Sequence, residues 1–171
     1  MEVSFRFAVR TDLGTVRTNN EDSALASERL LVLADGMGGH AAGEVASAVA
    51  ARVFSQVAEA DGDADVAARL TQAGRSTRAA LHEMSDADPL LESMGTTLLA
   101  VVSDGERVTV GHIGDSRVYA LRDSSLYQVT TDHTHVQRLV DTGQLTPEKA
   151  RTHPYRAMLL RSLDDQPGGP D

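Results

Sequence analysis

The stretch that most constrains the fold is residues 30–43, LLVLADGMGGHAAG, where an apolar run ends in a carboxylate followed by glycines. The run LLVLA is typical of a strand inside a hydrophobic core. Asp35 ends it, and four of the next eight residues are glycine, which lets the backbone approach another group closely. An unpaired carboxylate at the edge of a core is costly. The stretch therefore predicts a cation beside Asp35, either a metal ion or a basic side chain.

The composition restricts what such a chain can bind. Its 171 residues suffice for one domain with a hydrophobic core. The net charge of -9 argues against nonspecific binding to nucleic acids or to acidic membranes, because both attract a basic surface. The sequence has no cysteine, which excludes disulfides, thiolate nucleophiles and cysteine-based zinc sites.

The N-terminal sequence MEVSFRFAVRTD has no basic region followed by a long apolar one, so no signal peptide is visible. No stretch approaches the roughly 20 apolar residues that a membrane helix requires. We therefore expect a cytoplasmic enzyme or binding domain without a membrane segment and without a nucleic-acid partner.

The apolar patterning predicts strands, two helices, a meander of strands and then short helices. Residues 94–130 contain four short β-rich runs. Glycine and aspartate separate these runs, as in antiparallel hairpins. Before this region we expect strands at 3–10 and 28–35 and helices at 43–60 and 64–84; after it we expect helical turns at 135–143 and after Thr146. This order is typical of an α+β fold in which helices are segregated from an antiparallel sheet.

Three acidic clusters could carry chemistry: R17-T-N-N-E-D22, Asp35-Gly36 with His40 nearby, and G114-D-S-R117. Each alone can be a polar turn. The glycine-rich loop could also cradle a phosphate. However, it lacks the Lys-Ser/Thr of a P-loop and fits no dinucleotide-binding pattern, which disfavours a nucleotide-binding switch.

A zinc site at Asp132, His133 and His135 is a further alternative. Two histidines at positions i and i+2 point to opposite sides of an extended chain and seldom bind one metal. A structural role for these three residues is therefore the better interpretation.

Taken together, the clusters suggest metal-assisted hydrolysis of a phosphate ester. Glu21, Asp22, Asp35 and Asp115 offer hard oxygen ligands, which suit Mg²⁺ or Mn²⁺. Two such ions can activate water and neutralise a phosphoryl group. An arginine can grip the phosphate oxygens, and His40 could protonate the leaving alkoxide.

Five motifs in register give the chain a specific resemblance. These are R-x-x-N-E-D at 17–22, A-D-G-M-G-G-H-x-x-G-E at 34–44, M-G-T-T at 94–97, G-D-S-R at 114–117 and a segment at 131–163. In order and spacing they resemble the metal-dependent protein phosphatase (PPM) family, and most closely its bacterial serine/threonine phosphatases. The last segment resembles the flap of that family. The resemblance covers about residues 5 to 163.

The resemblance implies a sandwich of two antiparallel sheets flanked by helices, with two Mn²⁺ or Mg²⁺ ions. Asp35 would bridge both ions, and Gly36 would offer its backbone carbonyl to the second. Glu21 and Asp22 would hold the waters of that second ion. This implied site supplies the cation that Asp35 requires.

The same resemblance implies how the substrate is handled. Arg17 would bind the phosphate of a phosphoserine or phosphothreonine, and His40 would be the candidate general acid. Asp115 would help to hold a third, weaker ion. The partners would be phosphorylated proteins, the products of serine/threonine kinases.

The sequence departs from the family after Ser162. The S-D-G and D-N motifs that carry two further metal-binding aspartates are absent there, as are the closing strands of the sandwich. We therefore expect residues 1–171 to be a single, C-terminally incomplete phosphatase domain, with 164–171 as a loop or tail. The chain is then a fragment of a longer phosphatase or a truncated gene product, nearly inactive alone. The alternative is a non-catalytic module that binds phosphoproteins or a regulator.

Overall fold

The computed structural model describes residues 2–38, 41–57 and 65–166. Over these ranges the elements, in chain order, are β1 (Asp22–Ala26), β2 (Leu30–Met37), α1 (Ala42–Ser55), α2 (Val66–Ala87), the 3-10 helix η1 (Pro89–Leu91), β3 (Gly95–Thr96), β4 (Leu98–Ser103), β5 (Val108–Ile113), β6 (Tyr119–Arg122), β7 (Ser125–Gln128), α3 (His135–Asp141), α4 (Pro147–Ala150) and β8 (Leu163–Asp164).

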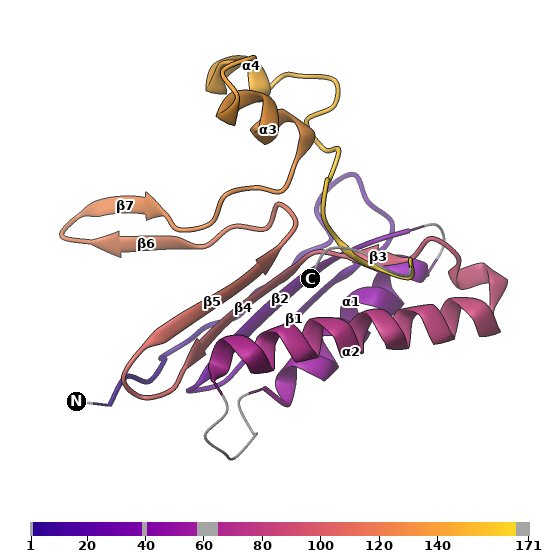
Figure 1. The fold of residues 1–171 in the computed structure, drawn as a ribbon, viewed down its shortest axis with the longest axis horizontal. Helices are drawn as coiled ribbons and strands as arrows, with labels where there is room; N and C mark the ends of the chain where they lie inside the picture. The colour runs from indigo at the N-terminus through magenta and orange to yellow at the C-terminus, as the bar shows by residue number, and fades with distance from the viewer. Residues whose placement is uncertain (1, 39–40, 58–64, 167–171) are drawn as a thin grey trace.

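The strands form two antiparallel sheets, and β2 is at the centre of the larger one. In that sheet the strand order is β5-β4-β2-β3-β8, and β1 also pairs with β2. The hairpin β6–β7 forms the second sheet. Helices α1 and α2 lie together against the larger sheet, whereas the hairpin and the α3–α4 segment project away from it (Figure 1). The α+β prediction with antiparallel sheets and segregated helices is confirmed.

The core lies between the larger sheet and α1 and α2. Phe54 is the largest fully buried side chain, and it packs in one cluster with residues of β2, β4 and α2. The alanines on the inner face of α1 are fully buried, whereas Val45 and Val53 are only half-buried. Small side chains on this face let the helix lie close to the strands. The buried face of α1 therefore combines alanines with Val49 and Phe54.

The predicted strand at 3–10 is wrong. Residues 3–10 are all described, and they form no strand. Isolated backbone bonds hold this segment: the Val3 amide donates to the Gly105 carbonyl, and the Phe5 amide donates to the Glu28 carbonyl, each at 2.7 Å. Because these bonds go to two different loops, they do not build a ladder. The strand that precedes β2 in the chain and pairs with it is instead β1, which was not predicted.

The other predicted helices are confirmed, with small shifts at their ends, whereas Asp164 of the predicted tail 164–171 belongs to β8 and residues 167–171 lie outside the described residues. Helices α1 and α2 correspond to the predictions for 43–60 and 64–84, of which residues 58–64 lie outside the described residues. Strands β4 to β7 lie where the β-rich runs were predicted, but they form two hairpins in different sheets, β4–β5 and β6–β7, rather than one meander. Thr146 caps α4 as predicted, since its hydroxyl accepts a hydrogen bond from the Lys149 amide.

The segment at 131–163, which we call the flap segment, is closed at its base. The His135 amide donates to the Met158 carbonyl at 2.9 Å, and the Leu160 amide donates to the His133 carbonyl at 2.7 Å. Its helices α3 and α4 lie together above the sheet (Figure 1). Across the described part of the chain, no helix is both long and apolar enough to cross a membrane.

The core position of Phe54 gives a test of this packing. Replacing Phe54 with alanine should lower the free energy of unfolding by about 3–5 kcal/mol, because it removes a buried ring and leaves a cavity. Val16→Ala is the matched control, since Val16 is 89% exposed, and it should change stability by less than about 0.5 kcal/mol. Urea denaturation measures both; equal losses would contradict the described core.

Candidate metal centre

The pairing of β1 with β2 brings two of the predicted metal ligands together. Asp22 lies directly opposite Asp35 in the antiparallel register, and directly opposed residues place their side chains on the same face of a sheet. Asp35 is the sixth residue of β2, next to the glycine-rich turn. After partial desolvation, the charge of Asp22 is the largest cause of the raised pKa of Asp35.

The backbone of Asp35 is fixed by two threonines of the M-G-T-T motif. The Asp35 amide donates to the Thr97 hydroxyl at 3.0 Å, and the Thr97 amide donates to the Asp35 carbonyl at 2.9 Å. The Thr96 hydroxyl also donates to that carbonyl, at 3.1 Å. The sequence alone indicates no role for these threonines. They position Asp35 because they form hydrogen bonds with both its backbone amide and its backbone carbonyl.

Glycines let three backbones converge beside Asp35. A Cβ atom on Gly36 would collide with the carbonyl of Gly43 and lie 2.6 Å from the Glu21 carbonyl oxygen. A Cβ atom on Gly43 would lie 2.9 Å from the Glu21 carboxyl carbon. The end of β2, the start of α1 and the loop before β1 therefore meet only because these two positions are glycine. This close approach explains the glycines at both ends of the turn.

The acids surround a hollow that also contains the predicted phosphate ligand. A cavity of about 190 Å³ is lined by Arg17, Glu21, Asp22 and Asp35 together with neighbouring loop residues. Arg17 is exposed, so its guanidinium is accessible to a ligand. The structure therefore brings four of the seven predicted site residues to one cavity.

The electrostatics of this cavity show an excess of negative charge. The pKa of Asp35 is raised, first by partial desolvation and then by the charges of Asp22 and Asp115. Arg17 lowers the same pKa, but its effect is smaller. Like charges in a confined site favour protonation of one of them. A bound dication would reverse this effect, because it stabilises the ionised carboxylates.

Asp115 lies in the turn after β5 and does not line this cavity, although its charge helps to raise the pKa of Asp35. Gly114 adopts a positive φ of 106°, and a Cβ there would lie 2.6 Å from the Thr97 side chain. The Thr97 hydroxyl in turn hydrogen-bonds the Ser116 hydroxyl at 2.8 Å. Thr97 thus links the turn that carries Asp115 to the backbone of Asp35.

The residues of the zinc alternative have structural contacts. Asp132 accepts two hydrogen bonds from the Arg117 guanidinium, at 2.8 and 2.6 Å. His133 accepts one from the Gly114 amide at 3.2 Å, and its ring stacks on that of His112 with centroids 4.8 Å apart. His135 instead meets Tyr155 edge to face. The sequence analysis missed the ion pair of Arg117 with Asp132, because it joins residues across the β6–β7 hairpin.

The donor set fits hard dications by its chemistry, although the ligands are not gathered into a compact cluster. Among the described residues, no three His, Cys, Asp or Glu side chains converge closely enough to hold a metal ion. Partial desolvation, and after it the charges of Asp22 and Asp115, raise the pKa of Asp35. His40 lies outside the described residues. The metal roles of Glu21, Asp22, Asp35, Gly36 and Asp115 therefore stay predictions.

Comparison with known proteins identifies the family. Residues 16–165 match the family model described as Protein phosphatase 2C. This chain belongs to the protein phosphatase 2C family. The resemblance to bacterial phosphatases that the five motifs predicted is thereby confirmed.

Among the relatives of this phosphatase 2C chain is the serine/threonine protein phosphatase PstP of Mycobacterium tuberculosis. It is 49% identical over 158 residues, which are 92% of this chain and 31% of PstP. The serine/threonine phosphatase stp of Listeria monocytogenes is 37% identical over 168 residues, covering 90% of this chain and 65% of that protein. The chain thus spans about a third of the first relative and under two thirds of the second.

Solved structures agree with the described fold. The crystal structure of PstP/Ppp from M. tuberculosis superposes with a TM-score of 0.91 at 47% identity, covering 98% of this chain and 72% of that one. A structure of the PstP catalytic domain in complex with two manganese ions superposes with a TM-score of 0.88 at 45% identity, covering 98% and 70%. The two manganese ions in the second structure agree with the Mn²⁺ or Mg²⁺ cofactor predicted for this chain.

The raised pKa of Asp35 predicts that Asp35→Asn stabilises the metal-free chain. With metal present, the same substitution should remove the stabilisation that the metal provides. In the folded, metal-free chain this group binds its proton more tightly than in the unfolded chain, so stability falls as the pH rises through the raised pKa. At neutral pH, Asp35→Asn should therefore raise the melting temperature in a chelator. Adding Mn²⁺ should raise the melting temperature of the native chain but not that of the variant.

Asp123→Asn is the control for this experiment. Asp123 has a positive φ of 49° in the exposed β6–β7 turn, a conformation that asparagine also accepts. This variant should respond to Mn²⁺ as the native chain does. A native-like Mn²⁺ response of the Asp35→Asn variant would show that Asp35 is not a metal ligand.

Proposed function

We propose that this chain is the catalytic part of a metal-dependent protein phosphatase that hydrolyses phosphoserine and phosphothreonine in proteins. The observation that carries the proposal is the fixed position of Asp35 opposite Asp22, in one cavity with Arg17. Relatives with 37–49% identity carry the name of serine/threonine phosphatases. These features disfavour the alternative of a non-catalytic binding module.

The acidic side of the cavity would hold two Mn²⁺ or Mg²⁺ ions. Asp35 would ligate both ions, the Gly36 carbonyl would face one of them, and Glu21 and Asp22 would orient its waters. Asp115 would help to hold a third ion. When bound, the ions supply an activated water and neutralise charge on the phosphoryl group.

The remaining residues act on the substrate. The Arg17 guanidinium would bind two phosphate oxygens in bidentate fashion, which orients the phosphorus toward the acidic side of the cavity. His40 would donate a proton to the departing serine or threonine oxygen. The threonine contacts to the Asp35 backbone would keep this arrangement rigid while charge builds up on the phosphoryl group.

The proposed partners are phosphorylated proteins made by serine/threonine kinases. A phosphoester on a protein is attached to a bulky chain, so the cavity that binds it must be open to solvent. Arg17 is exposed at the cavity, which allows a phosphorylated loop to enter. The chain's net charge of -9 makes bound cations necessary for such an anionic substrate.

Arg17 provides the test of the proposed function. In the longest natural version of the protein that contains this chain, phosphate release from a phosphoserine peptide should depend on Mn²⁺. Arg17→Ala should raise KM by about 30- to 150-fold, since a bidentate charged contact contributes about 2–3 kcal/mol. The Mn²⁺ concentration for half-maximal activity should stay unchanged.

Arg122→Ala is the matched control, because Arg122 is an exposed arginine on β6. It should leave KM unchanged. A shift of the Mn²⁺ titration without a change in KM would place Arg17 in the metal shell instead. Peptide binding without any phosphate release would support the non-catalytic alternative.

A further inference from the structure

A groove of about 670 Å³ lies between the flap segment and the turn after β5. Its wall includes Val136 of α3 and Pro147 of α4, and it shares no lining residue with the cavity that contains Asp35. Asp115 lines the groove, and its charge also helps to raise the pKa of Asp35. The groove is therefore a separate surface in the neighbourhood of the proposed catalytic cavity.

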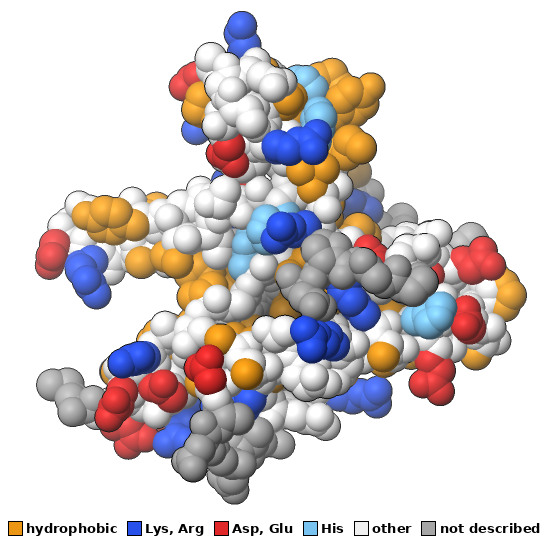
Figure 2. All heavy atoms as spheres, viewed as in Figure 1, with side chains coloured by type: hydrophobic (Ala, Val, Ile, Leu, Met, Phe, Trp, Pro, Cys, Tyr) orange, Lys and Arg blue, Asp and Glu red, His pale blue; other side chains and the backbone are white. Residues whose placement is uncertain are grey.

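The flap segment carries a charge opposite to that of the rest of the chain. It has five Lys or Arg residues against three Asp or Glu residues, a net charge of +2. Because the whole chain has a net charge of -9, the remaining residues carry -11. Figure 2 shows basic side chains on the surface of the flap segment, at the top of the molecule. This local excess of positive charge indicates an anionic partner.

Arg151 and Arg156 supply the positive charge of the groove. Both are exposed and line it, and neither guanidinium forms an ion pair or a hydrogen bond with another described residue. The pKa of Glu148 is lowered first by hydrogen bonds from its own amide and from the Thr146 hydroxyl, and Arg151 contributes last. Both guanidinium groups are therefore available to a ligand.

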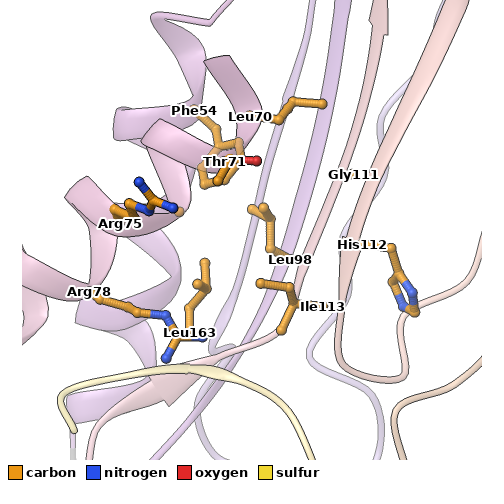
Figure 3. Close-up of a pocket in the computed structure, with 11 residues that line it drawn as sticks. Phe54, Leu70, Thr71, Arg75, Arg78, Leu98, Gly111, His112, Ile113 and Leu163 are labelled. Carbon is orange, nitrogen blue, oxygen red and sulfur yellow. The ribbon is translucent and has the colours of Figure 1, made fainter. Parts of the chain in front are cut away.

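Other arginines of the structure are already engaged. Arg117 also lines the groove, but its guanidinium donates to Asp132 at 2.8 and 2.6 Å. At the hollow of about 150 Å³ between α2 and the sheet (Figure 3), Arg78 donates to the Ser162 carbonyl at 3.0 Å and lies 3.8 Å from Asp164. The groove beside the flap segment differs from that hollow because it combines open space with two unpaired arginines.

We propose that Arg151 and Arg156 bind an acidic side chain that flanks the phosphorylated residue of the substrate protein, an inference that rests on the proposed phosphatase function. A guanidinium binds a carboxylate through charge-assisted hydrogen bonds, often in bidentate fashion. Because Asp115 lines the groove and acts on Asp35, a peptide whose phosphate is bound at Arg17 can extend into the groove. Asp115 repels a carboxylate, so the acidic side chain lies at the two arginines rather than at the turn.

A pair of phosphopeptide analogues tests the proposal. Both carry a phosphonate in place of the phosphoserine ester, so that they bind without being hydrolysed, and they differ only in having glutamate or glutamine on both sides of it. Fluorescence anisotropy measures their affinity for the longest natural version of the protein with Mn²⁺ present. The glutamate peptide should bind about fivefold more tightly, since exposed charge pairs are individually weak. Equal affinities would overturn the proposal.

Substitutions in the flap segment assign this preference to the groove. Replacing both Arg151 and Arg156 with glutamine should make the two peptides bind equally. Arg138→Gln is the matched control, because Arg138 is an exposed arginine of α3 that does not line the groove, and it should keep the fivefold preference. A preference that persists in the double variant, or that disappears in the control, would refute the site. If a thermal melt shows that the double variant does not fold, Arg156→Gln alone decides, since it should reduce the preference at least about twofold.

Phosphate release from the corresponding phosphoserine peptides is measured separately. The phosphonate comparison requires no turnover, so it decides on the groove even when no phosphate is released. Absence of release by the native protein would contradict the proposed function alone. Normal release without any preference for the glutamate peptide would contradict only the role of the two arginines.

Discussion

The convergence of backbones at Gly36 is the contact on which the rest of the structure depends. There the end of β2 touches the start of α1 at Gly43 and the loop that carries Glu21. Any side chain at either glycine would move α1 away from the sheet. Since the buried alanines of α1 pack on the same strands, the core and the acidic cavity rely on one close approach. The fold cannot loosen this contact without losing both.

The same region contains a pair of acidic residues that destabilises the fold. Asp22 and Asp35 oppose each other in a two-strand ladder, where like charges destabilise the pair. The threonines behind Asp35 offset part of that cost, because they satisfy its backbone amide and carbonyl. A bound dication would relieve the repulsion between these two carboxylates. Among the described residues, however, no three such side chains are gathered closely enough to hold a metal ion.

The sequence predicted the elements whose signals are local. The apolar run before Asp35, the glycines after it and the cap at Thr146 depend on neighbours in the chain, and the structure confirms each of them. The α+β order followed from the pattern of apolar residues, and the family resemblance followed from five motifs in register. For the candidate site, the sequence indicated four acids, and the structure brings three of them to the cavity with Arg17; Asp12 also lines this cavity and was not predicted.

What the sequence could not predict depends on pairing between distant segments. Residues 3–10 alternate like a strand, but alternation does not specify a partner, and their backbone bonds go to separate loops. β1 reads DSALA and lacks a strong pattern, yet it pairs fully with β2. The role of Thr97 was equally hidden, because it acts on a residue 62 positions away.

The closed base of the flap segment has a consequence for how this family can change. Residues 134 and 159 pair across its base as an isolated bridge, so the two ends of the segment lie next to each other. An insertion between such neighbouring points leaves the scaffold's register untouched. The flap segment is therefore an exchangeable module: evolution, or an engineer, can lengthen, shorten or replace it while Asp35 and its supporting threonines keep their places.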